Sequence, residues 1–196
     1  MKNIARERLP HIAVFAAVVA VVLSTHAAHA EERQGEEIPG GHLYIGLSAE
    51  GTQPFGRALI SRDQLTAGSA GGLYIHYEGE RFLVGAEIAR GHFGHDDTYS
   101  NPFLLAIRAG PVFGSSRYAP YLAVGVAQLA FGAIGDDAAS ARGLTAEAGV
   151  LLFRQLRWFR ATAFLQYNLP IWGDAGKGVE NVTSLSWAAL GVRVEL

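Results

Sequence analysis

The chain contains no cysteine and one methionine among its 196 residues. Without cysteine, an exported fold must hold without disulfides, and neither thiol catalysis nor a cysteine-ligated metal site is possible. Long hydrophobic runs are also lacking after residue 30, where no segment approaches the about 20 apolar residues that a membrane helix needs. The formal net charge of −2 gives no electrostatic reason to expect nucleic acid as a partner. The 24 glycines that are present suit closely packed strands better than helices.

The N-terminus has the pattern of a secretory signal peptide. A net basic start is followed by an apolar run from Ile12 to Leu23 and then by Ala28-His29-Ala30. The alternative, a retained transmembrane helix, would need a longer apolar run. We therefore expect a signal peptide over residues 1–30, cleaved after Ala30, a charged flexible lead-in over 31–41, and one domain over 42–196, since the remaining chain suits a single domain.

The stretch from Arg157 to Leu169 shows the strand type that organises the rest of the chain. Apolar residues at 159, 161, 163, 165, 167 and 169 alternate with polar residues at 160, 162, 166 and 168, and Phe164 is the one exception. This period of two is that of an extended strand with two different faces. At about 3.3 Å per residue such a strand, tilted, crosses the ~25 Å apolar band of an outer membrane. Trp158 and Trp172 supply aromatic residues near its two ends.

The same alternation recurs along the chain. The expected strands are 42–50, 71–79, 82–91, 102–114, 120–132, 143–153, 157–169 and 184–196. In the fifth of these, the row that faces lipid is left open beyond Gln128. Long and short connections alternate, with 51–67, 92–101, 133–142 and 170–183 as the long ones, as in barrels that pair short periplasmic turns with longer external loops. An even strand number closes without an unpaired edge. The sequence therefore predicts an all-β, eight-stranded antiparallel up-and-down transmembrane β-barrel.

The row of residues assigned to the barrel interior carries both signs of charge. It consists of Glu50, His76, Glu78, Glu87, Arg108, Glu147, Arg160, Arg193 and Glu195. The interior of an eight-stranded barrel is just wide enough for side chains to fill it, and buried charges need partners. We therefore expect a structural polar network in the lumen, formed by Glu78, Glu87, Arg108, Glu147, Arg160, Arg193 and Glu195. A narrow gated pore is the alternative.

The segment Pro120-Tyr121-Leu122-Ala123-Val124-Gly125-Val126, the strand count, the signal peptide and the alternating C-terminal strand together resemble the small outer-membrane β-barrel families, such as the OmpA transmembrane domain and OmpX. The resemblance implies a monomer in the outer membrane of a Gram-negative-type cell. It also implies outer-membrane lipid, including lipopolysaccharide, and the barrel-assembly machinery as partners. The surface ligand stays open. Family members often end in an aromatic residue, whereas the last residue here is Leu196.

An enzyme alternative comes from barrels that hydrolyse lipids. The lipid A deacylase family carries His-x-Ser near the outer end of its penultimate strand, where the histidine activates the serine. This chain has Gln166-Tyr167-Asn168 at the comparable place, with neither base nor nucleophile, and Glu180 is a lone loop carboxylate. We therefore expect no catalytic residue.

A second site alternative is the segment from His92 to Asp97, which has residue types that bind metals. Because a loop lacks the fixed geometry of a stable metal site, we expect a hydrated external loop and neither metal nor cofactor. The function expected is a non-enzymatic structural or surface-interaction role. A lipid A-modifying enzyme, a narrow pore and a soluble lipocalin-like barrel of reversed polarity are the alternatives.

Overall fold

The computed structural model describes residues 41–55, 66–94, 99–114, 117–134, 137–156, 158–174 and 181–196. The expected signal peptide and residues 31–40 of the expected lead-in lie outside these ranges. Within them, no helix is long and apolar enough to cross a membrane.

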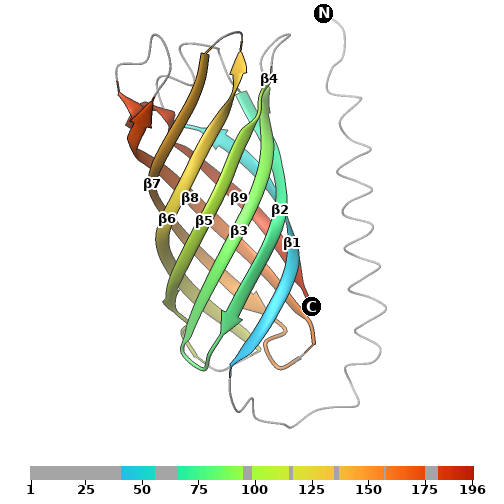
Figure 1. The fold of residues 1–196 in the computed structure, drawn as a ribbon. Coiled ribbons are helices and arrows are strands. Elements are labelled where there is room, and N and C mark those ends of the chain that lie inside the picture. Colours follow the sequence, from blue (N-terminus) through green and yellow to red (C-terminus); the bar gives the residue numbers. More distant parts are fainter. Residues whose placement is uncertain are drawn as a thin grey trace, which may run out of the picture. The chain divides into compact units, whose positions relative to one another are not determined.

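Eight long strands form a closed antiparallel sheet (Figure 1). They are β1 (His42–Pro54), β2 (Thr66–Glu78), β3 (Phe82–Gly94), β5 (Pro102–Pro111), β6 (Tyr118–Ile134), β7 (Asp137–Leu152), β8 (Arg160–Asp174) and β9 (Trp187–Glu195). Each long strand pairs with the next one along the chain, and the two-residue β4 (Tyr99–Ser100) adds a short pairing to β3. The sheet closes where β9 pairs with β1. The predicted eight-stranded up-and-down barrel is confirmed.

The two ends of the barrel differ in their connections. At one end, here called the turn end, β2 and β3 are joined through Gly79–Arg81, β5 and β6 through residues 112–117, and β7 and β8 through residues 153–159. The strands β1, β3, β6 and β8 end at the opposite end of the barrel, here called the loop end. The chain closes near the turn end, where the Ile45 N–H donates to the Leu196 carbonyl at 3.0 Å and the Leu196 N–H donates back at 2.9 Å.

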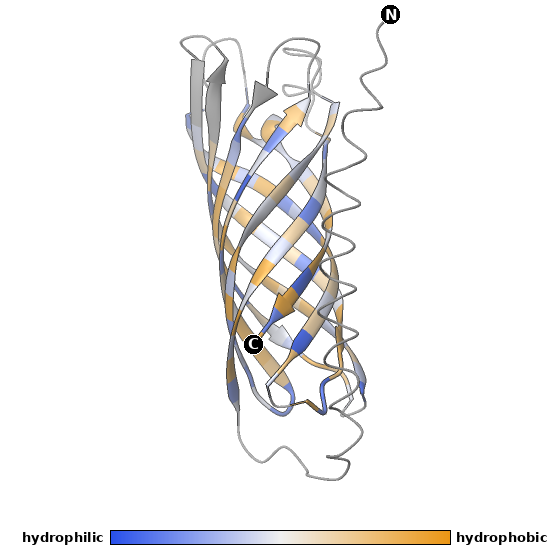
Figure 2. Cartoon of the chain, turned by 90° about the vertical axis from the view of Figure 1, so that its right-hand side faces the viewer, coloured by the Kyte–Doolittle hydropathy of each residue, from blue (hydrophilic) through white to orange (hydrophobic). Residues whose placement is uncertain are grey.

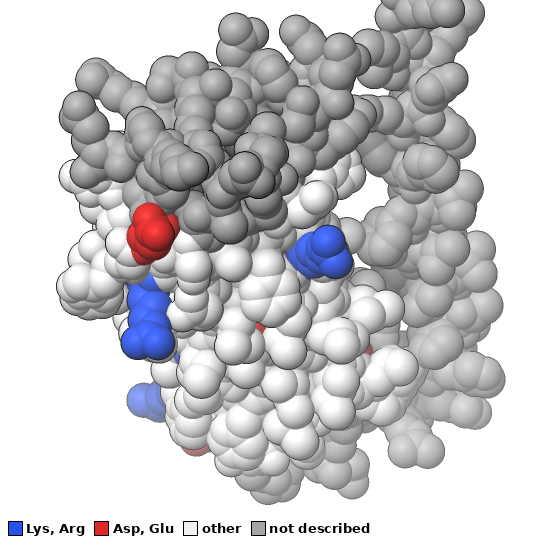
Figure 3. Space-filling model, turned by 45° about the horizontal axis from the view of Figure 1, so that its top comes forward, with Lys and Arg blue, Asp and Glu red and all other residues white. Residues whose placement is uncertain are grey.

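The barrel wall is apolar outside and polar inside. On β1, Leu43, Ile45 and Leu47 are each at least 57% exposed, whereas Tyr44 and Glu50, of opposite parity, are buried. Hydropathy alternates in the same way along the other strands (Figure 2), and few of the described residues on the face that Figure 3 shows are charged. A soluble lipocalin-like barrel has the reverse arrangement, so this alternative is wrong.

Several expected boundaries are wrong, most of them at the loop end, where β1, β3 and β8 run past the expected strand ends to Pro54, Gly94 and Asp174 and β2 begins at Thr66 rather than at residue 71. Residues 133–142 were expected to form a loop, but β6 extends to Ile134 and β7 begins at Asp137. The ladder continues because outward polar side chains are compatible with a strand that projects beyond the apolar band, as in the pair Gln128 and Arg142. The last strand starts at Trp187 rather than at residue 184.

A short 3-10 helix, η2 (Val182–Leu185), precedes this last strand. Asn181 caps it, since its side chain accepts a hydrogen bond from the Thr183 N–H at 3.0 Å. This local cap competes with extension of the strand.

Part of the predicted lipid-facing row of β8 is covered. Ala163, Leu165 and Tyr167 face outward, but Phe159 and Ala161 are buried. At this end of the strand the chain turns back from β7, and the rings of Phe153 and Trp158 lie 6.0 Å and 5.8 Å from that of Phe159. In the first residues of this stretch, local packing rather than strand alternation therefore decides which side chains are buried.

Side chains fill the lumen in layers. An apolar cluster at the loop end includes Phe93, Leu129, Leu185 and Trp187, with the rings of Phe93 and Trp187 in edge contact at 6.2 Å. A second apolar cluster lies at the turn end beneath β3, β5, β6 and β7; it comprises Leu83, Val112, Ala119, Tyr121, Ala123 and Leu151. The charged side chains lie between these clusters and beside the second one.

Candidate functional site: the charged lumen

Four charged side chains meet in the middle of the barrel. Glu87 of β3, Arg108 of β5, Glu147 of β7 and Arg193 of β9 are all at most 3% exposed. Arg108 Nη1 lies 2.7 Å from Glu87 Oε2 and 3.2 Å from Glu147 Oε2. Arg193 Nη2 lies 2.6 Å from Glu147 Oε2 and 3.3 Å from Glu87 Oε1. Each guanidinium thus contacts both carboxylates, so four strands are joined across the lumen by alternating charges.

Neutral side chains complete this central group. Arg108 Nε donates to Thr145 Oγ1 at 3.0 Å, and the Tyr121 hydroxyl donates to Glu147 Oε1 at 2.6 Å. The Arg193 guanidinium carbon lies 3.8 Å from the ring centre of Phe164 and 4.0 Å from that of Tyr74. Both distances are within the range of cation–π attraction. Phe164, the residue that breaks the alternation of its strand, therefore lies inside the barrel as an aromatic contact of a buried cation.

A second charged group lies nearer the turn end. Glu78 of β2 accepts from Arg154 Nε at 2.5 Å and from Arg160 Nε at 2.9 Å. His76 Nδ1 lies 3.2 Å from Glu195 Oε1, and its Nε2 lies 3.8 Å from Glu78 Oε2. The guanidinium of Arg160 lies over the ring of Tyr44, with its central carbon 4.7 Å from the ring centre. This group links the first strands of the barrel to the last ones.

Arg154 also connects the turns. Its Nη1 donates to the Gly114 carbonyl at 2.6 Å, and its Nη2 donates to the carbonyls of Gly79 at 3.1 Å and Glu80 at 2.6 Å. One buried guanidinium from the β7–β8 connection therefore holds the other two connections of the turn end. Sequence reasoning missed Arg154, because strand parity assigns no direction to a residue in a turn. The signal in the sequence was an arginine in a tight turn that contains no acidic residue to pair with it.

The residues expected to form the lumen network fall into these two groups. Glu87, Arg108, Glu147 and Arg193 lie in the central group, whereas Glu78, Arg160 and Glu195 lie in the group near the turn end. Glu50, also expected inside, is 6% exposed, and its Oε1 has no hydrogen-bond partner among the described residues.

The position comparable to the deacylase motif lies inside the barrel. Gln166 and Asn168 are fully buried, and Gln166 Nε2 donates to Asn168 Oδ1 at 3.0 Å. Neither side chain offers a nucleophile or a base on the outer wall, where a lipid acyl chain would approach. Glu180 lies outside the described residues.

The segment considered for metal binding is divided by the structure. His92, Phe93 and Gly94 belong to β3, so the expected loop starts later than predicted, and Phe93 lies in the apolar cluster at the loop end. His95, Asp96 and Asp97 lie outside the described residues. The described part of the chain brings together no group of three or more potential metal ligands.

Comparison with solved structures supports the fold. The chain is similar to Neisserial surface protein A, with a TM-score of 0.62, 14% identity, and coverage of 81% of this chain and 99% of that one. Ail of Yersinia pestis is 17% identical at a TM-score of 0.47, with coverage of 81% and 100%. The N-terminal β-barrel domain of Pseudomonas aeruginosa OprF is 21% identical at a TM-score of 0.46, with coverage of 80% and 99%. No protein-family model and no curated protein sequence matches the chain.

The fold and its polarity together give the location. In lipid, every backbone polar group must be paired, which a closed barrel achieves, and the exposed aliphatic rows match an apolar acyl environment. The protein is an outer-membrane β-barrel of the small eight-stranded type.

Proposed function

We propose that the protein is a non-enzymatic outer-membrane barrel with a structural or surface-interaction role, in which the filled lumen provides a rigid membrane anchor. The observation that carries this proposal is the pairing of Arg108 and Arg193 with Glu87 and Glu147 across the middle of the lumen. These charges are partnered by one another, and an apolar cluster lies on their loop side. Such an interior favours a role as an anchor over one as a conduit.

The proposal includes how the protein reaches the membrane. Cleavage after Ala30 would leave a lead-in over 31–41 and the barrel domain over 42–196. The barrel-assembly machinery would insert this domain, and surrounding lipid, including lipopolysaccharide, would contact the exposed aliphatic rows. The barrel would be a monomer whose connections at the loop end meet a surface partner. The intact mass of the protein purified from outer membranes tests the processing step, since cleavage elsewhere gives a different mass.

Two measurements on the same preparations test the role. Lipid A from cells that lack the protein and from cells that overproduce it should show the same acyl pattern; a changed pattern in the overproducing cells would indicate the enzyme alternative. The full chain in planar bilayers should show no steady conductance, whereas conductance that a Glu147→Gln variant alters would indicate the pore alternative.

A further inference from the structure

The outward face of the described strands carries two arginines, Arg90 on β3 and Arg142 on β7. They differ in their surroundings. Arg142 Nε donates to Gln128 Oε1 at 3.1 Å, and Gln128 Nε2 donates to Ser140 Oγ at 3.0 Å, so this arginine belongs to a polar chain across β6 and β7. Arg90 makes no hydrogen bond or ion pair with any described residue. Within the described part of the chain, no carboxylate pairs with this exposed guanidinium on the lipid-facing wall.

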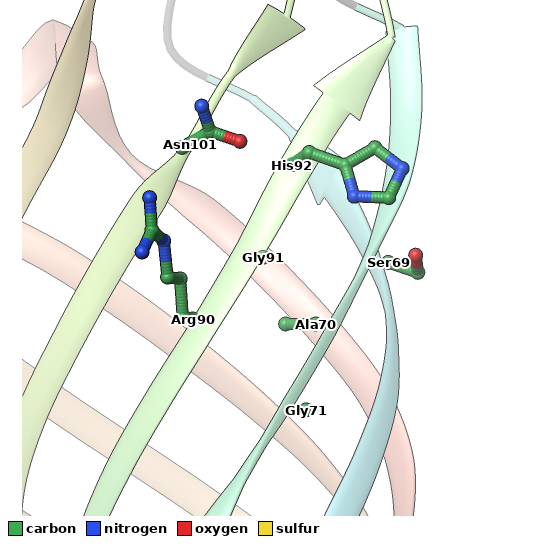
Figure 4. Close-up of a pocket in the computed structure, with 7 residues that line it drawn as sticks. All are labelled: Ser69, Ala70, Gly71, Arg90, Gly91, His92 and Asn101. Atoms are coloured by element: carbon green, nitrogen blue, oxygen red, sulfur yellow. The ribbon is translucent and has the colours of Figure 1, made fainter.

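The wall is hollowed beside Arg90. The hollow has a volume of about 380 Å³, and its lining includes Ser69, Gly71, Arg90, His92 and Asn101. The register explains it, because Gly71 stands opposite Arg90 and Ser69 stands opposite His92 on the paired strands β2 and β3. The residues of β2 in this hollow are small and leave space on the wall. In Figure 4, His92 extends towards β2, whereas Arg90 extends towards Asn101.

The hollow lies at the loop-side edge of the apolar band. Two residues before Arg90 on β3 comes Ile88, which is 49% exposed and pairs with Leu73 on one side and Leu105 on the other. Phe103, the partner of Arg90 on β5, is an exposed aromatic residue at the same level. An arginine on the lipid face is costly at the midplane of the membrane but not at its interface. This places Arg90 at the depth of the lipid headgroups.

We propose that this hollow binds a phosphate group of an outer-leaflet lipid headgroup. A guanidinium matches the geometry of phosphate oxygens in two-point hydrogen bonding, so Arg90 would supply the charge. The Ser69 hydroxyl and the Asn101 amide line the same hollow and can donate further hydrogen bonds. The exposed Ile88 and Leu73 below it would contact the acyl chains of the same lipid. The inference rests on the outer-membrane anchoring role proposed above, and it names one lipid contact of that role.

The test uses the full chain purified from outer membranes in a neutral detergent, with diphosphoryl lipid A as the probe and native mass spectrometry as the readout. Arg90→Gln should weaken lipid binding about fivefold, the effect expected of one cation at an anionic membrane surface. Arg90→Lys keeps the charge but not the two-point hydrogen bonding, so it should retain only part of the binding. Arg142→Gln, the matched control on β7, should leave the binding unchanged. Equal binding by the native protein and Arg90→Gln would overturn the proposal.

Two further arms separate the possible sources of phosphate and the possible causes of failure. Dephosphorylated lipid A should bind the native protein as weakly as diphosphoryl lipid A binds Arg90→Gln. Inorganic phosphate that saturates the site at a concentration at which lipid A does not bind would overturn the assignment to a lipid. Heat-modifiable gel migration first shows whether each variant is folded. A native barrel that is folded but binds no lipid A contradicts this site alone. A native protein that stays in solution without detergent contradicts the membrane role itself. Ser69→Leu, which fills the hollow and keeps Arg90, provides a second variant that should also lose binding.

Discussion

Arg193 and Glu147 form a two-point ion pair although their strands are not neighbours. Arg193 Nη1 lies 2.7 Å from Glu147 Oε1 and Nη2 lies 2.6 Å from Oε2, while β8 runs between β9 and β7. The pair passes over Phe164, which β8 contributes to the interior, and the guanidinium stacks on its ring. A side chain that broke the sequence pattern therefore supports the contact at the centre of the lumen.

Removing one partner of this pair should be costly. Glu147→Gln leaves Arg193 and Arg108 short of a buried carboxylate, and breaking a buried ion pair in this way destabilises a protein by about 3–5 kcal/mol. Urea-dependent folding into detergent micelles or liposomes measures the change. Glu80→Gln, at an exposed turn residue, should stay within about 0.5 kcal/mol of the native protein. A Glu147→Gln variant as stable as this control would contradict the assigned role of the pair.

Neighbouring positions of opposite parity on β8 should respond differently to the same charge. Leu165 is 55% exposed on the lipid face, so Leu165→Arg should reduce the stability of the inserted barrel by about 2–4 kcal/mol. Gln166 is buried inside and stands opposite Glu147 in the ladder, so Gln166→Arg should be better tolerated. Folding into liposomes measures both. Equal losses would show that the two faces are assigned wrongly.

The hydrogen bonds of Arg154 lead us to expect that this residue stabilises the connections at the turn end. Arg154→Ala removes the hydrogen bonds to Glu78 and to the carbonyls of two other connections, and leaves the carboxylate of Glu78 with Arg160 as its remaining arginine partner. We expect a loss of at least about 3 kcal/mol, with faster amide hydrogen exchange at residues 79–81 and 153–156. Arg117→Ala serves as the control, because this exposed arginine makes ring contacts worth about 0.5–1 kcal/mol. Unchanged exchange at the turns in Arg154→Ala would refute the link.

A glycine makes room for the ring beneath Arg193. A Cβ added at Gly191 would lie 2.6 Å from Phe164 Cζ and 2.7 Å from the Ala49 carbonyl oxygen, so Gly191→Ala should overpack the lumen at a cost of about 1–3 kcal/mol. At Gly51, on the outward face, the nearest atom would be 3.8 Å away. Gly51→Ala should therefore change stability by less than about 0.5 kcal/mol in the same folding assay. Similar effects of the two substitutions would contradict the packing described here.

The sequence predicts the fold well because parity is a local property. Wherever one face of a strand meets acyl chains and the other meets the lumen, alternate residues must differ in polarity. The direction of each side chain can therefore be inferred from its own strand, without knowing which strand pairs with it. This is why the inward direction of Glu87, Arg108 and Arg193 follows from their neighbours alone.

Contacts between distant residues are not local and could not be predicted in the same way. The sequence does not reveal that Arg193 pairs with Glu147, two strands away, since this contact depends on the tilt and register of three strands. The role of Arg154 depends on three connections meeting at one end of the barrel. The early start of β7 was missed because its outward residues Ser140 and Arg142 are polar, so this segment lacks the apolar outer row that marks a lipid-facing strand.

The central claim is that parity along each strand divides lipid-facing from lumen-facing side chains. Because the chain contains no cysteine, single cysteines placed at each position from 162 to 168 can carry a nitroxide label without interference. In liposomes, the accessibility of the label to dissolved oxygen should be high at 163, 165 and 167 and low at 162, 164, 166 and 168. An accessibility that varies smoothly along the segment, or one with the high values at 164 and 166, would contradict the account.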